Sequence, residues 1–111
     1  MFYLNTTRHL ITPADDTVIA TLLHRLDTEI GPKAESLEGL RNLSWLVSTD
    51  RMTIQAFSGW DHAEDLPRAE NSDAHRQNGA VIAELLGGLA EPQSHSYYEL
   101  IAARTIGTGA R

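Results

Sequence analysis

The sequence contains no cysteine among its 111 residues. This absence excludes disulfides, a thiolate nucleophile and zinc–sulfur sites, and it is typical of a protein from a reducing compartment. No apolar run approaches the roughly 20 residues that a membrane-spanning helix needs. The first residues also lack the basic start and apolar run of a secretory signal. We therefore expect a cytoplasmic protein.

Basic residues are scarce. Nine Lys and Arg stand against fifteen Asp and Glu, so the formal net charge is −6. Nucleic acids and anionic membrane surfaces both attract basic proteins, and we expect neither as a partner. The hydrophobic fraction of 41% and the charged fraction of 22% are ordinary for a globular protein. The length suits one domain, which we place at residues 1–104, followed by a flexible C-terminal tail at 105–111.

The usual catalytic motifs are missing too. The sequence has no glycine-rich phosphate loop, no serine nucleophile elbow and no paired carboxylate motif. No two of its five histidines stand at i and i+4 with a helical acid between them, which removes the common metal motif. We expect no cofactor and no metal ion.

The first half of the chain alternates strand and helix patterns. Residues 2–11 are rich in aromatic and β-branched side chains and predict a strand. Thr12 and Pro13 are good first residues for a helix, and Gly31-Pro32 should stop it or bend it sharply. The helix between them carries one apolar stripe, formed by Val18, Ile19, Leu22, Leu23, Leu26 and Ile30.

The second half continues this alternation. Residues 43–48 and 52–60 predict two strands joined by a tight turn, hence a hairpin. A short helix interrupted by Pro67 should follow at 61–71, and Ser72 or Asp73 should cap a longer helix that ends near Leu89. Residues 95–103 predict the last strand. The order is therefore β-α-β-β-α-β, and the fold class is α+β of the ferredoxin-like type, with a four-stranded antiparallel sheet and helices on one face.

Three local features suggest a family. Thr12-Pro13 follows the first strand, the hairpin ends in Gly59-Trp60-Asp61, and the segment 96–100 closes the fold after the second long helix. In these respects residues 2–103 resemble the dimeric α/β-barrel superfamily, and within it the antibiotic-biosynthesis-monooxygenase-like domains. The resemblance implies a homodimer in which two sheets pack face to face. The residues agree, because both strand faces carry apolar groups: Leu4 and Leu10 on one, Tyr3 and Ile11 on the other.

The resemblance also suggests chemistry. Enzymes of this kind hold their substrate between sheet and helices, and some oxidise phenolic or anthrone-like molecules with dioxygen and no cofactor. The monooxygenase branch places an Asn four residues before the hairpin-end Trp; here Trp60 matches, but Ala56 takes the place of the Asn. The haem-degrading branch implies an Asn near Thr7, a Trp near Ala69 and a His on the second long helix. Only His75 lies in roughly the right region, so haem degradation is the less favoured activity.

The polar residues of the first strand define a candidate pocket. Asn5, Thr7 and His9 share one face of this strand with Tyr3, because side chains alternate. Polar groups on a face that packs against helices need partners, water or a ligand. We therefore expect a cavity between sheet and helices for a flat aromatic ligand. Its catalytic residues would be His75 and Asn5, and its substrate-binding residues would be Thr7, His9, Trp60, Tyr97 and Tyr98.

Each of these assignments has a plainer alternative. His9 fits a strand-end residue in solvent, His95 an edge residue of the last strand, and Trp60 a core residue. The sequence thus favours a small cofactor-independent monooxygenase acting on a phenolic or polyketide-like aromatic. A non-catalytic dimeric ligand-binding protein is the alternative.

Overall fold

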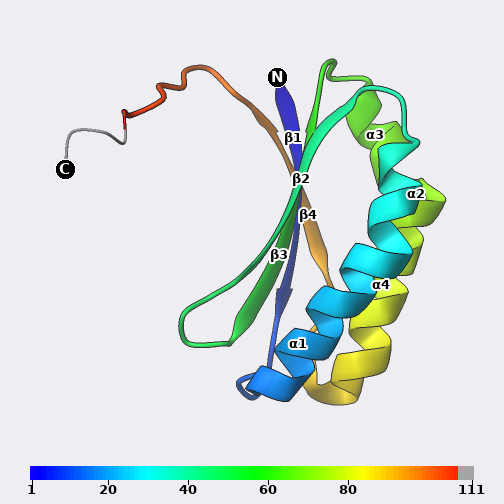
Figure 1. Ribbon diagram of the computed structural model, residues 1–111, viewed down its shortest axis with the longest axis vertical. Coiled ribbons are helices and arrows are strands. Elements are labelled where there is room, and N and C mark those ends of the chain that lie inside the picture. The colour runs from blue at the N-terminus through cyan, green and yellow to red at the C-terminus, as the bar shows by residue number, and fades with distance from the viewer. Residues whose placement is uncertain (108–111) are drawn as a thin grey trace.

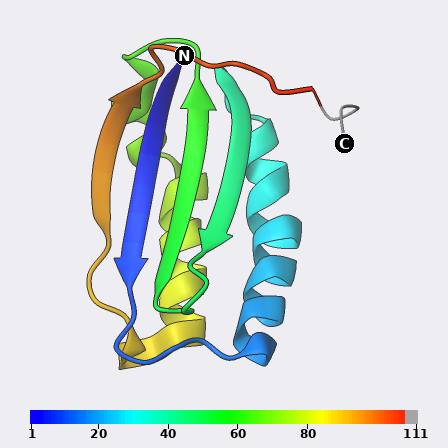
Figure 2. The ribbon, with the colours of Figure 1, turned by 90° about the vertical axis from the view of Figure 1, so that its left-hand side faces the viewer.

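A four-stranded antiparallel sheet carries all the helices on one of its faces (Figures 1 and 2). The computed structural model describes residues 1–107. The elements follow the chain as β1 (Phe2–His9), α1 (Asp16–Arg25), the π-helical turn η1 (Leu26–Ile30), α2 (Gly31–Glu35), β2 (Leu40–Val47), β3 (Thr53–Trp60), α3 (Asp65–Glu70), α4 (Asp73–Leu86), the 3-10 turn η2 (Gly87–Leu89) and β4 (Ser94–Glu99).

The strands lie in the order β2-β3-β1-β4, with β1 and β3 in the centre. The predicted β-α-β-β-α-β order and ferredoxin-like class are therefore confirmed. In Figure 2 the uncovered face of the sheet is toward the viewer, with the helices behind it. Residues 101–107 have no regular structure and run away from the sheet as an exposed segment (Figure 1). The remainder of the tail predicted at 105–111 lies outside the described residues.

The first helix begins later than predicted. Asp15, not Thr12, is its N-cap, and the Asp15 Oδ1 accepts a hydrogen bond of 2.8 Å from the Val18 N–H. The reason is tertiary. The Ala14 N–H donates to the carbonyl of Arg51 in the β2–β3 turn, so Thr12 and Pro13 form a link across the end of the sheet.

The helical segment continues through Gly31-Pro32, where the sequence predicted a stop or a sharp bend. Pro32 has no N–H, and its ring would clash with the carbonyl four residues back in a regular helix. The chain avoids this with the π-helical turn, in which the Gly31 N–H bonds to the Leu26 carbonyl, and α2 then continues. Pro67 likewise lies inside α3, in the first turn, where no N–H is needed.

Two apolar clusters fill the space between sheet and helices. The larger joins Leu10, which directly follows β1, and Ile54 of β3 to α1, η1 and α4, through Leu22, Leu26, Ile30, Val81, Ile82 and Leu86. The smaller joins β1 and β3 to α3, through Leu4, Trp60, Leu66 and Ala69. A cavity opens between the two, because its wall includes members of both.

Candidate functional site

The cavity lies on the helix-facing side of the sheet. Thr6 of β1, Trp45 of β2 and Ser58 of β3 line it from the sheet, and Ile30 and Asn78 line it from the helices. Its volume is about 50 Å³. A cavity of about 150 Å³ is known to hold a benzene molecule, so this inner space accepts only one edge of a larger ligand.

A wider cleft adjoins the cavity. It has a volume of about 660 Å³ and shares five wall residues with the cavity: Leu37, Trp60, Ala69, Ser72 and Ala74. Its rim carries the cations Lys33, Arg68 and Arg76 and the anions Glu38 and Asp73. Arg68 is paired with Asp65 and Arg76 with Asp73, so the charges at the rim largely compensate one another. The cavity and the cleft together reach the size usual for small-molecule sites.

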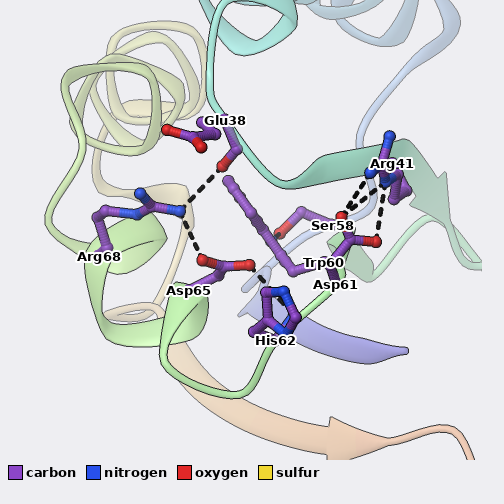
Figure 3. A network of polar contacts seen from close by, with 8 residues as sticks. All are labelled: Glu38, Arg41, Ser58, Trp60, Asp61, His62, Asp65 and Arg68. Carbon is purple, nitrogen blue, oxygen red and sulfur yellow. Dashed lines mark hydrogen bonds and ion pairs between the residues drawn. The ribbon is translucent and has the colours of Figure 1, made fainter.

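Trp60 lies where the two spaces meet and is held by a polar network (Figure 3). Only 2% of it is exposed, and its indole Nε1–H donates to the Ser58 Oγ at 2.8 Å. Next to it the buried Asp65 carboxylate accepts from Arg68 at 2.5 Å and from the His62 backbone N–H at 3.2 Å. Arg68 also donates to the Glu38 carbonyl, which ties α3 to the start of β2.

Two polar groups of the cavity wall satisfy each other. The Trp45 Nε1–H donates to the Asn78 Oδ1 at 3.0 Å, which fixes the indole against α4. Asn78 is buried, and it stands on the same side of α4 as the apolar Val81 and Ile82. Two indoles and a few polar groups thus surround the cavity, a composition that suits a flat aromatic ligand.

His75 brings a titratable group to the cavity wall. Ser72 caps α4 by accepting the His75 backbone N–H, which sets the ring one turn into the helix. The His75 Nε2 is 2.8 Å from the Nε2 of His95 on β4, and the ring centroids are 4.9 Å apart. Burial, and then the charge of His95, lower the pKa of His75, while Glu70 opposes the shift. His75 is therefore neutral at pH 7.

His95 links His75 to α3. Its Nδ1 is 3.6 Å from the Glu70 Oε1, and the Glu70 Oε2 accepts a hydrogen bond of 3.0 Å from the Tyr97 hydroxyl. The Gln93 amide is 3.3 Å from the His95 Nε2 and also accepts from Arg8. His95 lies beside the cavity residue Thr6, its register partner on β1. His95, which also fitted a simple edge residue of the last strand, is thus part of a network that ends at the cavity.

Of the seven site residues predicted from sequence, the structure brings two to the cavity, Trp60 and His75. Tyr97 is on the helix-facing side but lies outside the cavity, bonded to Glu70. The other four lie on the opposite, uncovered face of the sheet: Asn5, Thr7, His9 and Tyr98.

The predicted cavity wall on β1 is therefore wrong by one residue. Leu4 and Thr6 face the helices, so Asn5 and Thr7 must face away. There the Thr7 hydroxyl donates to the Asn5 Oδ1 at 2.7 Å and accepts from Gln55 at 3.2 Å. The large aliphatic pair Leu4 and Leu10 carried the correct signal in the sequence, because both belong to the helix-facing set and lie in the core.

Sequence reasoning also missed most of the cavity wall, including the polar or aromatic residues Thr6, Trp45 and Asn78. Because side chains alternate along a strand, the buried Leu4 indicates that Thr6, two residues later, faces the helices as well. Asn78 stands three residues after His75, and helical spacing places both with the apolar stripe of α4. Within residues 1–107, no cluster of three or more His, Cys, Asp or Glu side chains is arranged to hold a metal ion. No helix of this described part is long and apolar enough to cross a membrane.

No model of a known protein family matches the sequence, and no curated protein matches it. Solved structures do match. A monooxygenase from the ActVA-Orf6 gene of Streptomyces coelicolor, solved with the ligand nanaomycin D, superposes with a TM-score of 0.69 at 15% identity, over 96% of this chain and 92% of that one. A Deinococcus radiodurans protein provisionally described as an antibiotic biosynthesis monooxygenase gives 0.65 at 15% identity, over 97% and 100%.

A third similar structure is described as a dimeric protein of unknown function with a ferredoxin-like fold, from Bacteroides fragilis. Its TM-score is 0.63 at 14% identity, over 89% of this chain and 96% of that one. Identities this low establish the fold and not the activity. The chain has the fold of the antibiotic-biosynthesis-monooxygenase-like α/β domains, and the resemblance drawn from its sequence is confirmed at that level.

Proposed function

We propose that this protein is a cofactor-independent monooxygenase that binds a small phenolic or polyketide-like aromatic between sheet and helices. The observation that carries the proposal is the pair of adjoining spaces, an inner cavity with two indoles and His75 on its wall, and a wide outer cleft. The likeness to a monooxygenase solved with nanaomycin D supports it.

The volumes limit the binding mode. An inner space of about 50 Å³ takes the reacting edge of a ring system, and the cleft of about 660 Å³ takes the remainder. A ligand placed this way crosses Trp60, which borders both spaces.

The chemistry needs no redox group from the protein, because the substrate supplies all the electrons. Oxidation of an anthrone methylene to a carbonyl consumes one dioxygen; one oxygen atom enters the product and the other leaves as water. The protein binds the ring system, excludes water and removes a proton, so that an electron-rich phenolate meets dioxygen. Neutral His75 on the cavity wall is the candidate base.

The test is dioxygen uptake with a panel of anthrones and hydroquinones, in the presence of a metal chelator. We expect uptake stoichiometric with quinone formation. His75→Gln should lower the rate about 10²-fold or more, as for the loss of a general base. His24→Gln, an exposed histidine on α1, is the matched control and should leave the rate unchanged. Ligand binding without dioxygen uptake would instead favour the non-catalytic ligand-binding protein.

Assembly as a homodimer through the uncovered sheet face is part of the proposal. This face exposes Leu46 and Tyr98, and it contains the buried Nδ2 of Asn5, which has no hydrogen-bond partner among residues 1–107. A second copy on this face would cover the apolar groups, and the similar structure from Bacteroides fragilis is described as dimeric. Light scattering should give twice the mass of one chain. Leu46→Arg should reduce this mass to that of a monomer, whereas Leu23→Arg, at an exposed leucine on α1, should not.

A further inference from the structure

A line of polar side chains runs from the end of α3 through the edge strand β4 to the cavity, in the order Glu70, His95, His75. We propose that Gln93, His95 and Glu70 hold His75 as the tautomer protonated at Nε2, so that Nδ1 is the atom that accepts a proton from a hydroxyl group of the bound aromatic. This inference rests on the proposed function for the identity of the ligand. The tautomer itself follows from the hydrogen-bond pattern.

The first step is the orientation of the Gln93 side chain. A guanidinium group has donors and no acceptor. The Arg8 guanidinium donates to Gln93 at 2.8 Å, so the amide atom that faces it is the oxygen. The amide nitrogen, a donor, therefore faces the His95 Nε2 at 3.3 Å.

The second step fixes His95. Its Nε2 meets the Gln93 N–H and must accept, so in the neutral ring the proton resides on Nδ1. The His95 Nδ1 lies 3.6 Å from the Glu70 Oε1, and the negative charge of this carboxylate favours a proton on Nδ1. Glu70 is itself held from its other oxygen by the Tyr97 hydroxyl.

The third step fixes His75. With the proton of His95 on Nδ1, beside Glu70, its Nε2 carries one lone pair and no proton. The His75 Nε2 lies 2.8 Å from that atom, nearer than the Gln93 amide at 3.3 Å, so the His75 Nε2 must donate, and the longer Gln93 contact shares the same lone pair. In the neutral ring the His75 Nδ1 then carries a lone pair. This atom has no hydrogen-bond partner among residues 1–107. It is also not fully buried, because the fully buried side-chain polar atoms without a partner in this range are Asn5 Nδ2 and Arg8 Nε. A basic nitrogen is thus left available on a residue of the cavity wall.

The proton step balances within these groups. The ligand O–H bond breaks, an N–H bond forms at the His75 Nδ1, and the bonding electrons stay on the ligand oxygen as a phenolate. The imidazolium keeps its Nε2–H bond to His95, and Glu70 is the negative charge at the end of the line. Because burial disfavours the charged ring, the proton is readily returned when the reaction ends. Gln93, His95 and Glu70 act as positioning residues.

The experiment is ¹⁵N NMR of the free protein labelled in its histidine rings. Protonated and unprotonated ring nitrogens give well-separated ¹⁵N shifts, so each tautomer is read directly. We expect His75 with a protonated Nε2 and a bare Nδ1, and His95 with a protonated Nδ1. Gln93→Leu should move both rings toward a tautomer average, and Gln55→Leu, on the other face of the sheet, should not.

The outcomes separate this inference from the proposed function. A His75 ring protonated at Nδ1, or averaged between tautomers in the unmodified protein, overturns the inference even if the protein consumes dioxygen. The predicted tautomer in a protein that consumes no dioxygen overturns the monooxygenase proposal and leaves the tautomer assignment standing. With turnover, Gln93→Leu should lower kcat more than it changes KM, and an unchanged kcat would count against the positioning role.

Discussion

Substitution of Gly39 tests the polar network around Trp60, because Gly39 lies against the Asp65 carboxylate. Its φ of +89° is a conformation that L side chains rarely adopt, and a Cβ added there would lie 2.7 Å from the Asp65 Oδ2. That oxygen accepts the His62 backbone N–H. Gly39→Ala therefore combines two penalties. The positive φ costs about 1–2 kcal/mol, and displacing the carboxylate weakens a hydrogen bond worth about 1 kcal/mol. The free energy of unfolding should fall by about 2–3 kcal/mol.

A double-mutant cycle separates the two penalties. In an Asp65→Ala background the obstructing carboxylate is gone, so Gly39→Ala should cost only the backbone term, about 1–2 kcal/mol. The coupling should then be about 1 kcal/mol, above the roughly 0.5 kcal/mol within which independent sites add. Gly88→Ala is the control, because a Cβ there would contact nothing within 4 Å. Urea unfolding followed by circular dichroism measures all four variants and the parent.

Two results would refute this reasoning. If Gly39→Ala costs no more than Gly88→Ala, neither the backbone conformation nor the close approach to Asp65 holds in solution. If Gly39→Ala costs the same in both backgrounds, the carboxylate does not oppose the added methyl group.

Three further predictions concern the site. Ser72→Ala removes the N-cap of α4 and should lower the free energy of unfolding by about 1 kcal/mol in urea, whereas Ser72→Asp keeps an acceptor for the His75 N–H and should restore most of it. The pKa of His75 is lowered in the folded state, so this group contributes stability above the unfolded pKa near 6.5 that is lost as pH falls toward the folded pKa; His75→Gln should flatten that part of a stability–pH curve. Thr6→Leu should abolish binding of an aromatic ligand in a fluorescence titration, and Asn5→Leu should leave it unchanged; the opposite ranking would restore the pocket first drawn from the sequence.

The order of the elements could be predicted because each carries a local pattern. Alternation predicted β1 and the β2–β3 hairpin, and helical spacing predicted α1 and α4. The errors at helix boundaries have tertiary causes. Thr12 has a good capping side chain, but the Ala14 N–H finds a partner in the β2–β3 turn, so the helix starts at Asp16. Gly31-Pro32 has the composition of a helix end, but the preceding turn widens to a π-helix and the chain continues.

The site was harder to predict, because it depends on which face each strand presents. A shift of one position along β1 exchanges Thr6 for Asn5, and both are polar. The His75–His95 contact was beyond sequence reasoning for another reason. It requires β4 to pair with β1, so that His95 lies opposite Thr6, and it requires α4 to cross that part of the sheet. Neither the strand pairing nor the path of α4 can be predicted from the residues that surround His95 in the sequence.

The alternation of β1 also explains how one strand serves two surfaces. Thr6 lines the cavity, while the adjacent Asn5 and Thr7 close a hydrogen-bonded group with Gln55 on the uncovered face. Within that group the Asn5 Nδ2 is buried and finds no acceptor in the described part of the chain, a state that costs free energy unless a neighbour supplies one. A ligand in the cavity cannot reach it, since the sheet lies between them, whereas a second copy on the uncovered face can. Under the proposed function, the polar groups of β1 divide between a ligand on one side and a partner on the other, and substitutions at adjacent positions should change binding and assembly separately.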